Sequence, residues 1–404
     1  MKRVLVFLGA LALSIQLNAQ DDPEYHQLSG KNLNTITTAV PFLTIAPDAR
    51  GGAMGDAGVS SSPDANSIYW NAAKLAFLDK KMGFAMSYSP WLRKLVNDIN
   101  LAYLAYFYKL DKNQAVGFSL RYFTLGEIIF RQSAEDQGFP VKPNEFAFTG
   151  TYSRKLSNNL SGAVSARFIY SNLTLGQFVQ GAETTAGTSI AADVSLYWRK
   201  DVDLFDVNAE VAWGLIISNI GNKISYSAAN IEKDFIPTNL RFGPSVRLEL
   251  DDYNELSFMV DVNKLLVPTP PVYALDDNGQ PIIGPDNERV IAKGMDPNVS
   301  VIQGMLQSFY DAPEGFSEEM REFYYGFGAE YWYDKQFAVR GGFFYEDRTK
   351  GNRKFFTLGA GLRYNVFGLD FAYLIPLEQQ NPLENTLRFT LHFDFDAFQN
   401  QNNN

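Results

Sequence analysis

Long segments in which apolar and polar residues alternate constrain the fold of this chain more than any other feature. The segment 385–396 places apolar residues at every second position and polar residues between them: Leu387, Phe389, Leu391, Phe393 and Phe395 against Arg388, Thr390, His392 and Asp394. A period of two predicts a β-strand with one apolar and one polar face. Most of these segments run to roughly 10 to 13 residues, whereas strands of soluble proteins average about 5 to 6 and a tilted membrane-spanning strand needs about 9 to 11. The pattern therefore predicts membrane-spanning strands.

We expect about fourteen such strands between residues 83 and 396. Their expected ranges are 83–88, 99–110, 114–124, 144–155, 158–171, 187–200, 205–218, 237–251, 254–264, 322–333, 336–346, 354–365, 367–376 and 385–396. Short connections alternate with long ones, which is typical of outer-membrane barrels with short periplasmic turns. No free backbone N–H or C=O group can face hydrocarbon, so the sheet must close. The expected fold class is an all-β transmembrane antiparallel barrel, and an even number of strands places both termini in the periplasm.

The N-terminus and the composition predict the compartment. Residues 1–19 have a basic start, an apolar core and a small residue at Ala19, as secretory signal peptides do. Residues 20–29 are expected to form an N-terminal tail, and residues 397–404 a polar C-terminal tail. The chain has no cysteine and a net charge of -10. Disulfides and thiol nucleophiles are therefore excluded, and a nucleic-acid partner is not expected because phosphates need a basic surface. We expect the mature chain to reside in the outer membrane.

Residues 30–76 lack the alternation and are rich in glycine, proline and small residues. A lumen surrounded by about fourteen strands is wide enough to require filling by protein or water. We therefore expect this segment to fold into the lumen as a plug, with an ordinary periplasmic extension as the alternative. The candidate plug residues are Pro47, Asp48, Arg50, Gly51, Gly52, Met54, Gly55, Asp56 and Asn71.

Charged residues at the polar positions of the strands are expected to face the lumen and to bind the plug. This lumen charge network comprises Arg121, Arg167, Arg241, Arg247, Glu249, Arg340, Arg363 and Arg388, with Glu210, Glu330 and Asp370 as further inward acids.

Two stretches carry a resemblance to a known family. Residues 46–59 read Ala-Pro-Asp-Ala-Arg-Gly-Gly-Ala-Met-Gly-Asp-Ala-Gly-Val, and residues 69–74 read Tyr-Trp-Asn-Ala-Ala-Lys. In these stretches the chain resembles the PorV (LptO) family, which belongs to the wider FadL-like outer-membrane barrels. FadL-like proteins usually have Asn-Pro-Ala where this chain has Asn71-Ala72-Ala73.

The resemblance implies a component of the type IX protein secretion system. Its implied partners are the translocon barrel SprA (Sov), secreted cargo with a C-terminal signal domain, and the surface sortase PorU that receives the cargo. Outer-membrane lipid, including lipopolysaccharide, would surround the barrel. Two alternatives stay open: a FadL-like transporter of hydrophobic small molecules, and a lipid A O-deacylase.

The connection 265–321 is far longer than a mere link between strands. Residues 276–279 (Asp-Asp-Asn-Gly) predict a hairpin turn. Asp296 followed by Pro297 predicts the start of a helix. Apolar residues then recur at helical spacing and form the candidate partner-binding stripe: Val299, Ile302, Met305, Leu306 and Phe309. This stripe is expected either to cover the barrel mouth or to bind another protein.

The chain offers little material for catalysis. It contains 2 histidines. His26 falls in the N-terminal tail, and His392 is expected to face the lumen near Asp394. No Gly-x-Ser-x-Gly elbow occurs. We expect no catalytic residues, cofactor or metal, and His392 is the residue on which a deacylase would depend.

Overall fold

The computed structural model describes residues 33–93, 98–131, 137–173, 175–176, 178–179, 182–204, 206–227, 233–378 and 381–395. The expected signal peptide, the N-terminal tail with His26, and the tail 397–404 lie outside the described residues. Thr35–Asn404 form one unit.

Within the described residues, fourteen antiparallel strands close into a barrel in which each strand pairs with its neighbours in chain order and β20 pairs with β1. The strands are β1 (Met82–Pro90), β2 (Asn100–Lys109), β3 (Gln114–Thr124), β6 (Asn144–Lys155), β7 (Leu160–Asn172), β10 (Gly187–Leu204), β11 (Val207–Gly221), β12 (Asn239–Glu249), β13 (Asn254–Leu265), β16 (Tyr324–Tyr333), β17 (Phe337–Tyr345), β18 (Lys354–Tyr364), β19 (Phe367–Pro376) and β20 (Leu387–Asp394). The expected fold class is therefore confirmed.

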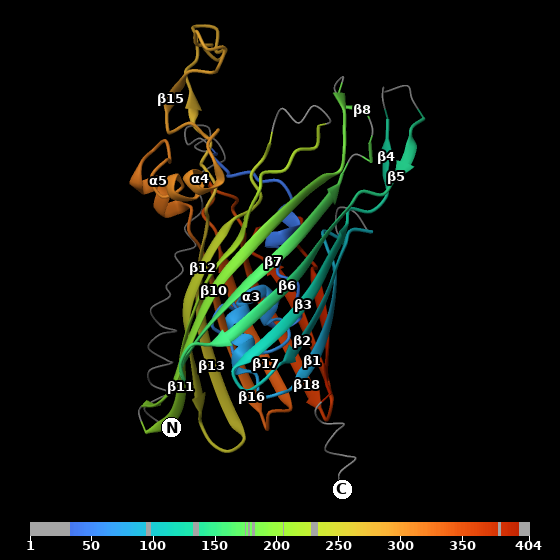
Figure 1. Cartoon of the computed structure of the whole chain (residues 1–404), viewed down its shortest axis with the longest axis vertical. Coiled ribbons are helices and arrows are strands. Elements are labelled where there is room, and N and C mark those ends of the chain that lie inside the picture. Colours follow the sequence, from blue (N-terminus) through green and yellow to red (C-terminus); the bar gives the residue numbers. More distant parts are fainter. Residues whose placement is uncertain are drawn as a thin grey trace. The chain divides into compact units, whose positions relative to one another are not determined.

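The connections differ at the two ends of the barrel (Figure 1). At one end, here called the turn end, short turns join the strands, as between β2 and β3. At the other end, here called the loop end, the connections are long. Among the described residues, three of them carry small hairpins: β4 (Ile128–Phe130) with β5 (Phe139–Val141), β8 (Phe178–Val179) with β9 (Ala182–Glu183), and β14 (Val272–Tyr273) with β15 (Ile291–Lys293). The hairpin turn expected at 276–279 is confirmed between β14 and β15, where the N–H of Gly279 donates to the carbonyl of Asp276 (3.0 Å) and Leu275 bridges to Pro281. The alternation did not predict the other two hairpins.

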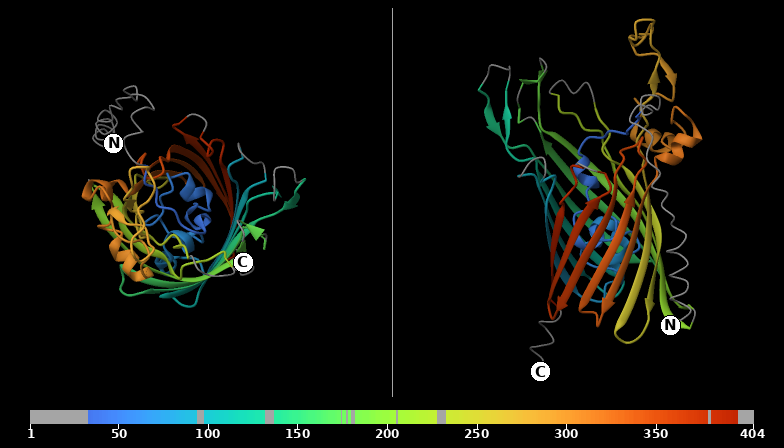
Figure 2. Two further views of the ribbon diagram at one scale, coloured as in Figure 1. Left: turned by 90° about the horizontal axis from the view of Figure 1, so that it is seen from above. Right: turned by 180° about the vertical axis from the view of Figure 1, so that it is seen from behind.

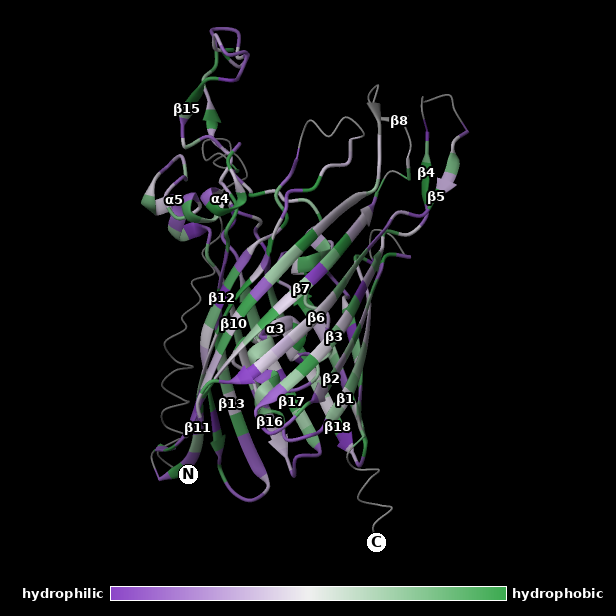
Figure 3. Ribbon diagram, in the orientation of Figure 1, coloured by the Kyte–Doolittle hydropathy of each residue, from purple (hydrophilic) through white to green (hydrophobic). Residues whose placement is uncertain are grey.

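Each strand presents one face to the outside and one to the interior. In β3, Phe118, Leu120 and Tyr122 are exposed on the outer wall, whereas Ser119 and Arg121 between them are buried. Figure 3 shows hydrophobic and hydrophilic residues following one another along the strands. This distribution places apolar side chains where lipid surrounds a barrel and polar side chains in its lumen.

The segment before β1 lies inside the ring of strands (Figure 2). Its short helices are η2 (Pro41–Thr44), α2 (Ala49–Gly52), α3 (Ser67–Trp70) and η3 (Ala72–Phe77). At α2, the carboxylate of Asp48 accepts a hydrogen bond from the N–H of Gly51 (2.8 Å), which satisfies a free donor of the first turn. We call residues 37–78 the internal segment.

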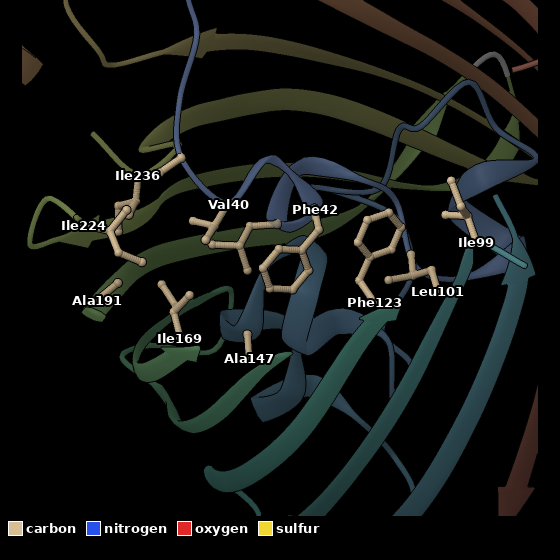
Figure 4. Packing of buried hydrophobic residues seen from close by; sticks show 12 residues of the cluster. Val40, Phe42, Ile99, Leu101, Phe123, Ala147, Ile169, Ala191, Ile224 and Ile236 are labelled. Atoms are coloured by element: carbon tan, nitrogen blue, oxygen red, sulfur yellow. The ribbon is translucent and has the colours of Figure 1, made fainter. Parts of the chain in front are cut away.

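Apolar side chains join the internal segment to the barrel wall near the loop end. Val40 and Phe42 are buried among side chains of several strands (Figure 4). The ring of Phe42 stacks on that of Phe123 in β3, with 6.2 Å between centroids. Ile169 of β7 is fully buried in the same cluster. Burial of these side chains supplies a hydrophobic contribution that is independent of the polar contacts deeper in the lumen.

Two helices interrupt the connection between β13 and β16: α4 (Val301–Gln307) and α5 (Phe316–Arg321). They lie side by side at the loop end (Figures 1 and 2). None of the helices in the described part of the chain is long and apolar enough to cross a membrane.

The expected start of α4 at Asp296 is wrong. The helix begins after Ser300, whose hydroxyl accepts a hydrogen bond from the N–H of Gln303 (3.4 Å). Asp296 instead accepts the N–H of Asn298 (2.8 Å) and closes a local turn, which is the alternative structure that short acidic side chains favour.

Candidate functional site

The internal segment contacts the wall through a buried ionic centre at Arg50. Its guanidinium donates to both carboxylate oxygens of Glu330 in β16, at 3.0 and 2.7 Å, and to Asp64 at 2.9 Å. Arg340 of β17 donates to the same Glu330 at 2.6 Å. Such a two-pronged contact fixes orientation as well as distance. Glu330 therefore ties the internal segment to two neighbouring strands.

The two glycines after Arg50 permit close packing. The indole N–H of Trp70 donates to Asp48 at 2.6 Å, and this places the Trp70 ring against Gly51. A Cβ atom on Gly51 would overlap that ring, and one on Gly52 would overlap the guanidinium of Arg388. Pro47 is buried beside this contact. The sequence singled out these positions as plug residues without predicting their partners.

Residues 54–56 meet the strands directly. Met54 is buried against Met259 of β13. Gly55 has a φ of 67°, and its N–H donates to the hydroxyl of Thr357 at 2.9 Å. Asp56 accepts a hydrogen bond from Arg388 at 2.9 Å.

Asn71 joins two parts of the internal segment to the wall. Its amide donates to the carbonyl of Val59 (3.1 Å) and to that of Leu196 in β10 (2.9 Å). Nearby, the fully buried ammonium of Lys74 donates to the carbonyl of Gly58 and the hydroxyl of Ser61, at 2.7 and 2.9 Å. Lys74 was not among the predicted site residues, although it lies within the Tyr-Trp-Asn-Ala-Ala-Lys stretch.

Most of the predicted lumen arginines pair with carboxylates. Arg340 and Arg363 both contact Asp370, at 2.9 Å each. Arg388 contacts Asp56, and Arg247 lies 3.5 Å from Glu210. Through Arg340, Asp370 is connected to Glu330 and to Arg50 of the internal segment, whereas the pair of Arg247 and Glu210 joins the neighbouring strands β11 and β12 separately.

Two lumen acids were missed. Arg167 contacts Asp193 of β10 at 2.7 Å, and Arg241 lies 4.0 Å from Asp261 of β13. Asp261 also accepts the N–H groups of Gly58 and Val59. Both acids occupy polar positions of the alternating pattern, so the signal that found the arginines also applies to them.

Two predicted members of the network behave differently. Arg121 is buried but forms no ion pair within the described residues. Glu249 is exposed at the end of β12 and forms no ion pair within the same described ranges, so its place in the lumen charge network stays a prediction. The end of a strand reaches solvent, where a carboxylate needs no partner.

The predicted partner-binding stripe lies mainly at the surface. Ile302 and Leu306 share one face of α4 and are 61% and 64% exposed. Phe309 is 45% exposed, Met305 is half-buried, and Val299 precedes the helix. The face of α4 that is buried carries Gly304 and Gln307 instead, so the stripe does not cover the barrel mouth.

The helix α5 adds to the exposed apolar face. Phe316 and Met320, four residues apart, are 78% and 45% exposed. We define the outer apolar surface by the exposed side chains of both helices and their connection: Ile302, Leu306, Phe309, Tyr310, Phe316 and Met320.

The opposite face of α5 is held to the barrel by ion pairs. Lys264 at the end of β13 contacts Glu319 (3.2 Å) and Glu322 (2.5 Å). Lys350 contacts Glu318 (2.6 Å) and Glu322 (2.9 Å). We call these five residues the acid anchor. Because the acidic face of α5 contacts Lys264 and Lys350, the exposed apolar face with Phe316 and Met320 lies on the other side of the helix, away from the barrel.

Asp311 lies next to the acid anchor. Burial raises the pKa of Asp311 from 3.8 to about 6, against the hydrogen bond from the N–H of Thr269 (3.1 Å), and the charges of Glu319 and Glu322 raise the pKa further. A carboxylate with a pKa of about 6 therefore lies beside the acid anchor.

Comparison with solved structures gives distant barrels. The structure is similar to the Ralstonia pickettii toluene transporter TbuX, with 13% identity, a TM-score of 0.44, and coverage of 86% of this chain and 96% of that chain. It is also similar to a Pseudomonas aeruginosa FadL homologue, with 12% identity, a TM-score of 0.43, and coverage of 90% and 99%. The CymD monoaromatic hydrocarbon channel gives 12% identity, a TM-score of 0.45, and coverage of 87% and 98%. No curated protein sequence matches the chain.

A family model provides the assignment that these distant barrels do not. The model described as "Type IX secretion system protein PorV" matches residues 28–272, which is more than half of the chain. The match includes the internal segment and the strands β1 to β13. The chain is an outer-membrane β-barrel, and it belongs to the PorV family of type IX secretion system proteins.

Proposed function

We propose that this barrel binds the translocon of the type IX secretion system, receives secreted cargo through its C-terminal signal domain, and passes it to the surface sortase. The proposed partners are SprA (Sov), PorU and the cargo domains, with outer-membrane lipid and lipopolysaccharide around the wall. Membership of the PorV family supports the system. The binding role rests on one observation, the outer apolar surface.

The outer apolar surface has the properties of a docking site. Exposed side chains on two adjacent helices present large apolar groups, such as Phe316 and Leu306, to solvent. Exposed apolar patches on folded proteins mark interaction sites, and aromatic residues contribute strongly to binding. The acid anchor holds this surface in one orientation, which reduces the entropy lost on binding.

We assign the loop end to the cell exterior and the turn end to the periplasm, with both termini on the periplasmic side. Short turns face the periplasm and long loops the exterior in outer-membrane barrels. In this orientation the outer apolar surface meets cargo that has crossed the membrane.

We assign the internal segment the role of a plug. The charge network around Arg50 and Glu330 connects it to the wall throughout the lumen. The cavity beside Tyr69 has a volume of about 30 Å³ and is lined by three arginines. It is too small and too polar to bind a hydrocarbon. These features favour a binding role over transport of hydrophobic molecules.

We further propose that the protein has no enzymatic activity. His392 lies 2.6 Å from Asp370, which also binds Arg340 and Arg363. These contacts join β17, β18, β19 and β20. A structural role of His392 in holding four strands together accounts for its presence in the lumen, and no catalytic role in lipid A deacylation is needed.

The test replaces two exposed residues of α4 together, Ile302→Asp and Leu306→Asp. We expect at least a tenfold loss of translocon and cargo recovered with the barrel from native outer membranes, because charged side chains replace the apolar contact. Identification of the recovered proteins by mass spectrometry provides the measurement.

A matched control lies in the same connection. Ile282 and Ile283 are also exposed, at 42% and 54%. They lie in residues 274–290 between β14 and β15, which we call the distal hairpin. The pair Ile282→Asp and Ile283→Asp should leave recovery unchanged, and circular dichroism should show an intact barrel in both variants. Equal recovery of partners with all three proteins would reject the proposed docking surface.

A further inference from the structure

A small cavity lies between the internal segment and the barrel wall, beside Tyr69. Its volume is about 30 Å³. Three guanidinium groups line it, from Arg121 of β3, Arg167 of β7 and Arg241 of β12. A buried cavity of this size holds one or two particles as large as water.

Two of the three arginines have acidic neighbours. Arg167 contacts Asp193 at 2.7 Å and also donates to the hydroxyl of Thr149 at 3.0 Å. Arg241 donates to the side-chain oxygen of Asn263 at 2.6 Å and lies 4.0 Å from Asp261.

Arg121 is only 5% exposed and has no such neighbour. Its Nη1 donates to the carbonyl oxygens of Phe42 (3.0 Å) and Leu43 (2.8 Å). Its guanidinium lies over the rings of Tyr69 and Tyr103, at 4.5 and 5.8 Å from their centroids. Across residues 33–93, 98–131 and the later described ranges, it pairs with no carboxylate. Three positive charges thus face two negative charges around the cavity.

Hydrogen-bond donors also face this space. The hydroxyl of Tyr103 lines the cavity, is buried, and has no hydrogen-bond partner among the described atoms. Nearby acceptors are already engaged, since Thr44 accepts the hydroxyl of Tyr69 at 3.1 Å and Asn239 accepts that of Tyr324 at 2.8 Å. Ser119 lines the cavity as well, so the space presents positive charge together with the hydroxyl groups of Tyr103 and Ser119.

Leaving a buried cation without a counter-charge is costly, because desolvation is not offset by an ion pair. The excess of one positive charge, the free hydroxyl and the small volume together select a monovalent, monoatomic anion. We propose that this cavity is a halide-binding site, in which Arg121 and the hydroxyl of Tyr103 hold a chloride ion.

An entrance is available from the loop end. A larger open cavity of about 400 Å³ is lined by residues of the internal segment and of the loops. Thr44 and Tyr324 line both cavities. Because the two cavities share these residues, we place the route of halide exchange between them.

The test is thermal unfolding of the full-length, detergent-solubilised protein at constant ionic strength, with sodium chloride or bromide replacing sodium gluconate. Specific binding to the folded state raises the Tm saturably, and we expect a rise of a few degrees. In Arg121→Gln the rise should disappear, because the neutral amide needs no counter-ion. Tyr103→Phe keeps the ring and should weaken the halide response.

Arg154→Gln is the matched control, since Arg154 is exposed at the end of β6. It should respond to halide as the wild type does. Crystals grown in sodium bromide should give an anomalous peak beside the Arg121 guanidinium. A Tm that does not depend on halide, or an equal rise in Arg121→Gln, would overturn the proposal, as would a bromide-grown crystal without that peak.

Discussion

Glu330 binds two arginines from separate parts of the chain, Arg50 of the internal segment and Arg340 of the next strand. Replacing it with glutamine keeps the shape but leaves two buried guanidinium groups without their shared counter-charge. We expect Glu330→Gln to lower the free energy of unfolding by about 3–5 kcal/mol, as for broken buried pairs. Urea unfolding in lipid vesicles, followed by tryptophan fluorescence, measures this change. The control Glu249→Gln, at an exposed position, should change the free energy of unfolding by less than about 0.5 kcal/mol. Equal effects of the two substitutions would show that the ion pairs of Glu330 do not stabilise the folded barrel.

At the scale of single residues, the sequence predicted which side chains face inward but not which ones meet. The period of two placed Arg167 and Arg340 in the lumen because every second residue of a strand points the same way. Their partners Asp193 and Glu330 depend on the strand order and on the depth of each residue along a tilted strand. Arg121 illustrates the limit, because nothing local distinguishes it from arginines that have acidic partners.

At the scale of elements, one carboxylate beside the contact between α5 and the barrel, that of Asp311, responds to pH. The raised pKa of Asp311, about 6, means that the folded state favours the protonated form. The contribution of Asp311 to stability is therefore fully present below its ordinary pKa of 3.8 and is lost as the pH rises through about 6. We expect amides of residues 301–321 to exchange with solvent on the order of tenfold faster at pH 8 than at pH 5, after correction for the intrinsic rate.

Asp311→Asn removes the titrating group and keeps an oxygen that can accept the N–H of Thr269. Its exchange rates should therefore depend much less on pH. Asp277→Asn, on the exposed distal hairpin, should retain the dependence of the wild type. An unaltered pH dependence in Asp311→Asn would show that Asp311 is not the titrating group.

Strands were easier to predict than helices for a physical reason. Each membrane-spanning strand faces lipid on one side and the lumen on the other along about 10 residues. The alternation of apolar and polar residues is therefore long, and it recurs in every strand. The helix α4 has only 7 residues, and its start depends on whether Asp296 or Ser300 accepts the first free N–H groups. The hairpin formed by β4 and β5 is largely exposed, and no apolar period marks it, whereas the turn at 276–279 was recognisable from its Asp-Asp-Asn-Gly residues.

At the scale of the whole molecule, the internal segment and the barrel stabilise each other. The ionic centre at Glu330 and the apolar cluster around Phe42 attach the segment at different depths and to different strands. Sequence composition predicted a segment inside the lumen, but the contacts that hold it come from strands far apart in the chain. Segments attached at several places open together rather than one contact at a time.

This mutual stabilisation predicts that the internal segment does not leave the lumen while the barrel is folded. Arg50 and Lys74 are 5% and 0% exposed, so trypsin should not cut after either residue in the native protein. On heating in detergent, both sites should become cleavable at the temperature at which the β-sheet signal in circular dichroism is lost. Cleavage after Arg289, which is exposed, verifies that the protease is active throughout. If Arg50 or Lys74 were cut well below the barrel transition, the segment would open as a separate unit, and its many buried contacts would not couple it to the wall. In Glu330→Gln the two transitions should fall together, because one carboxylate serves both parts.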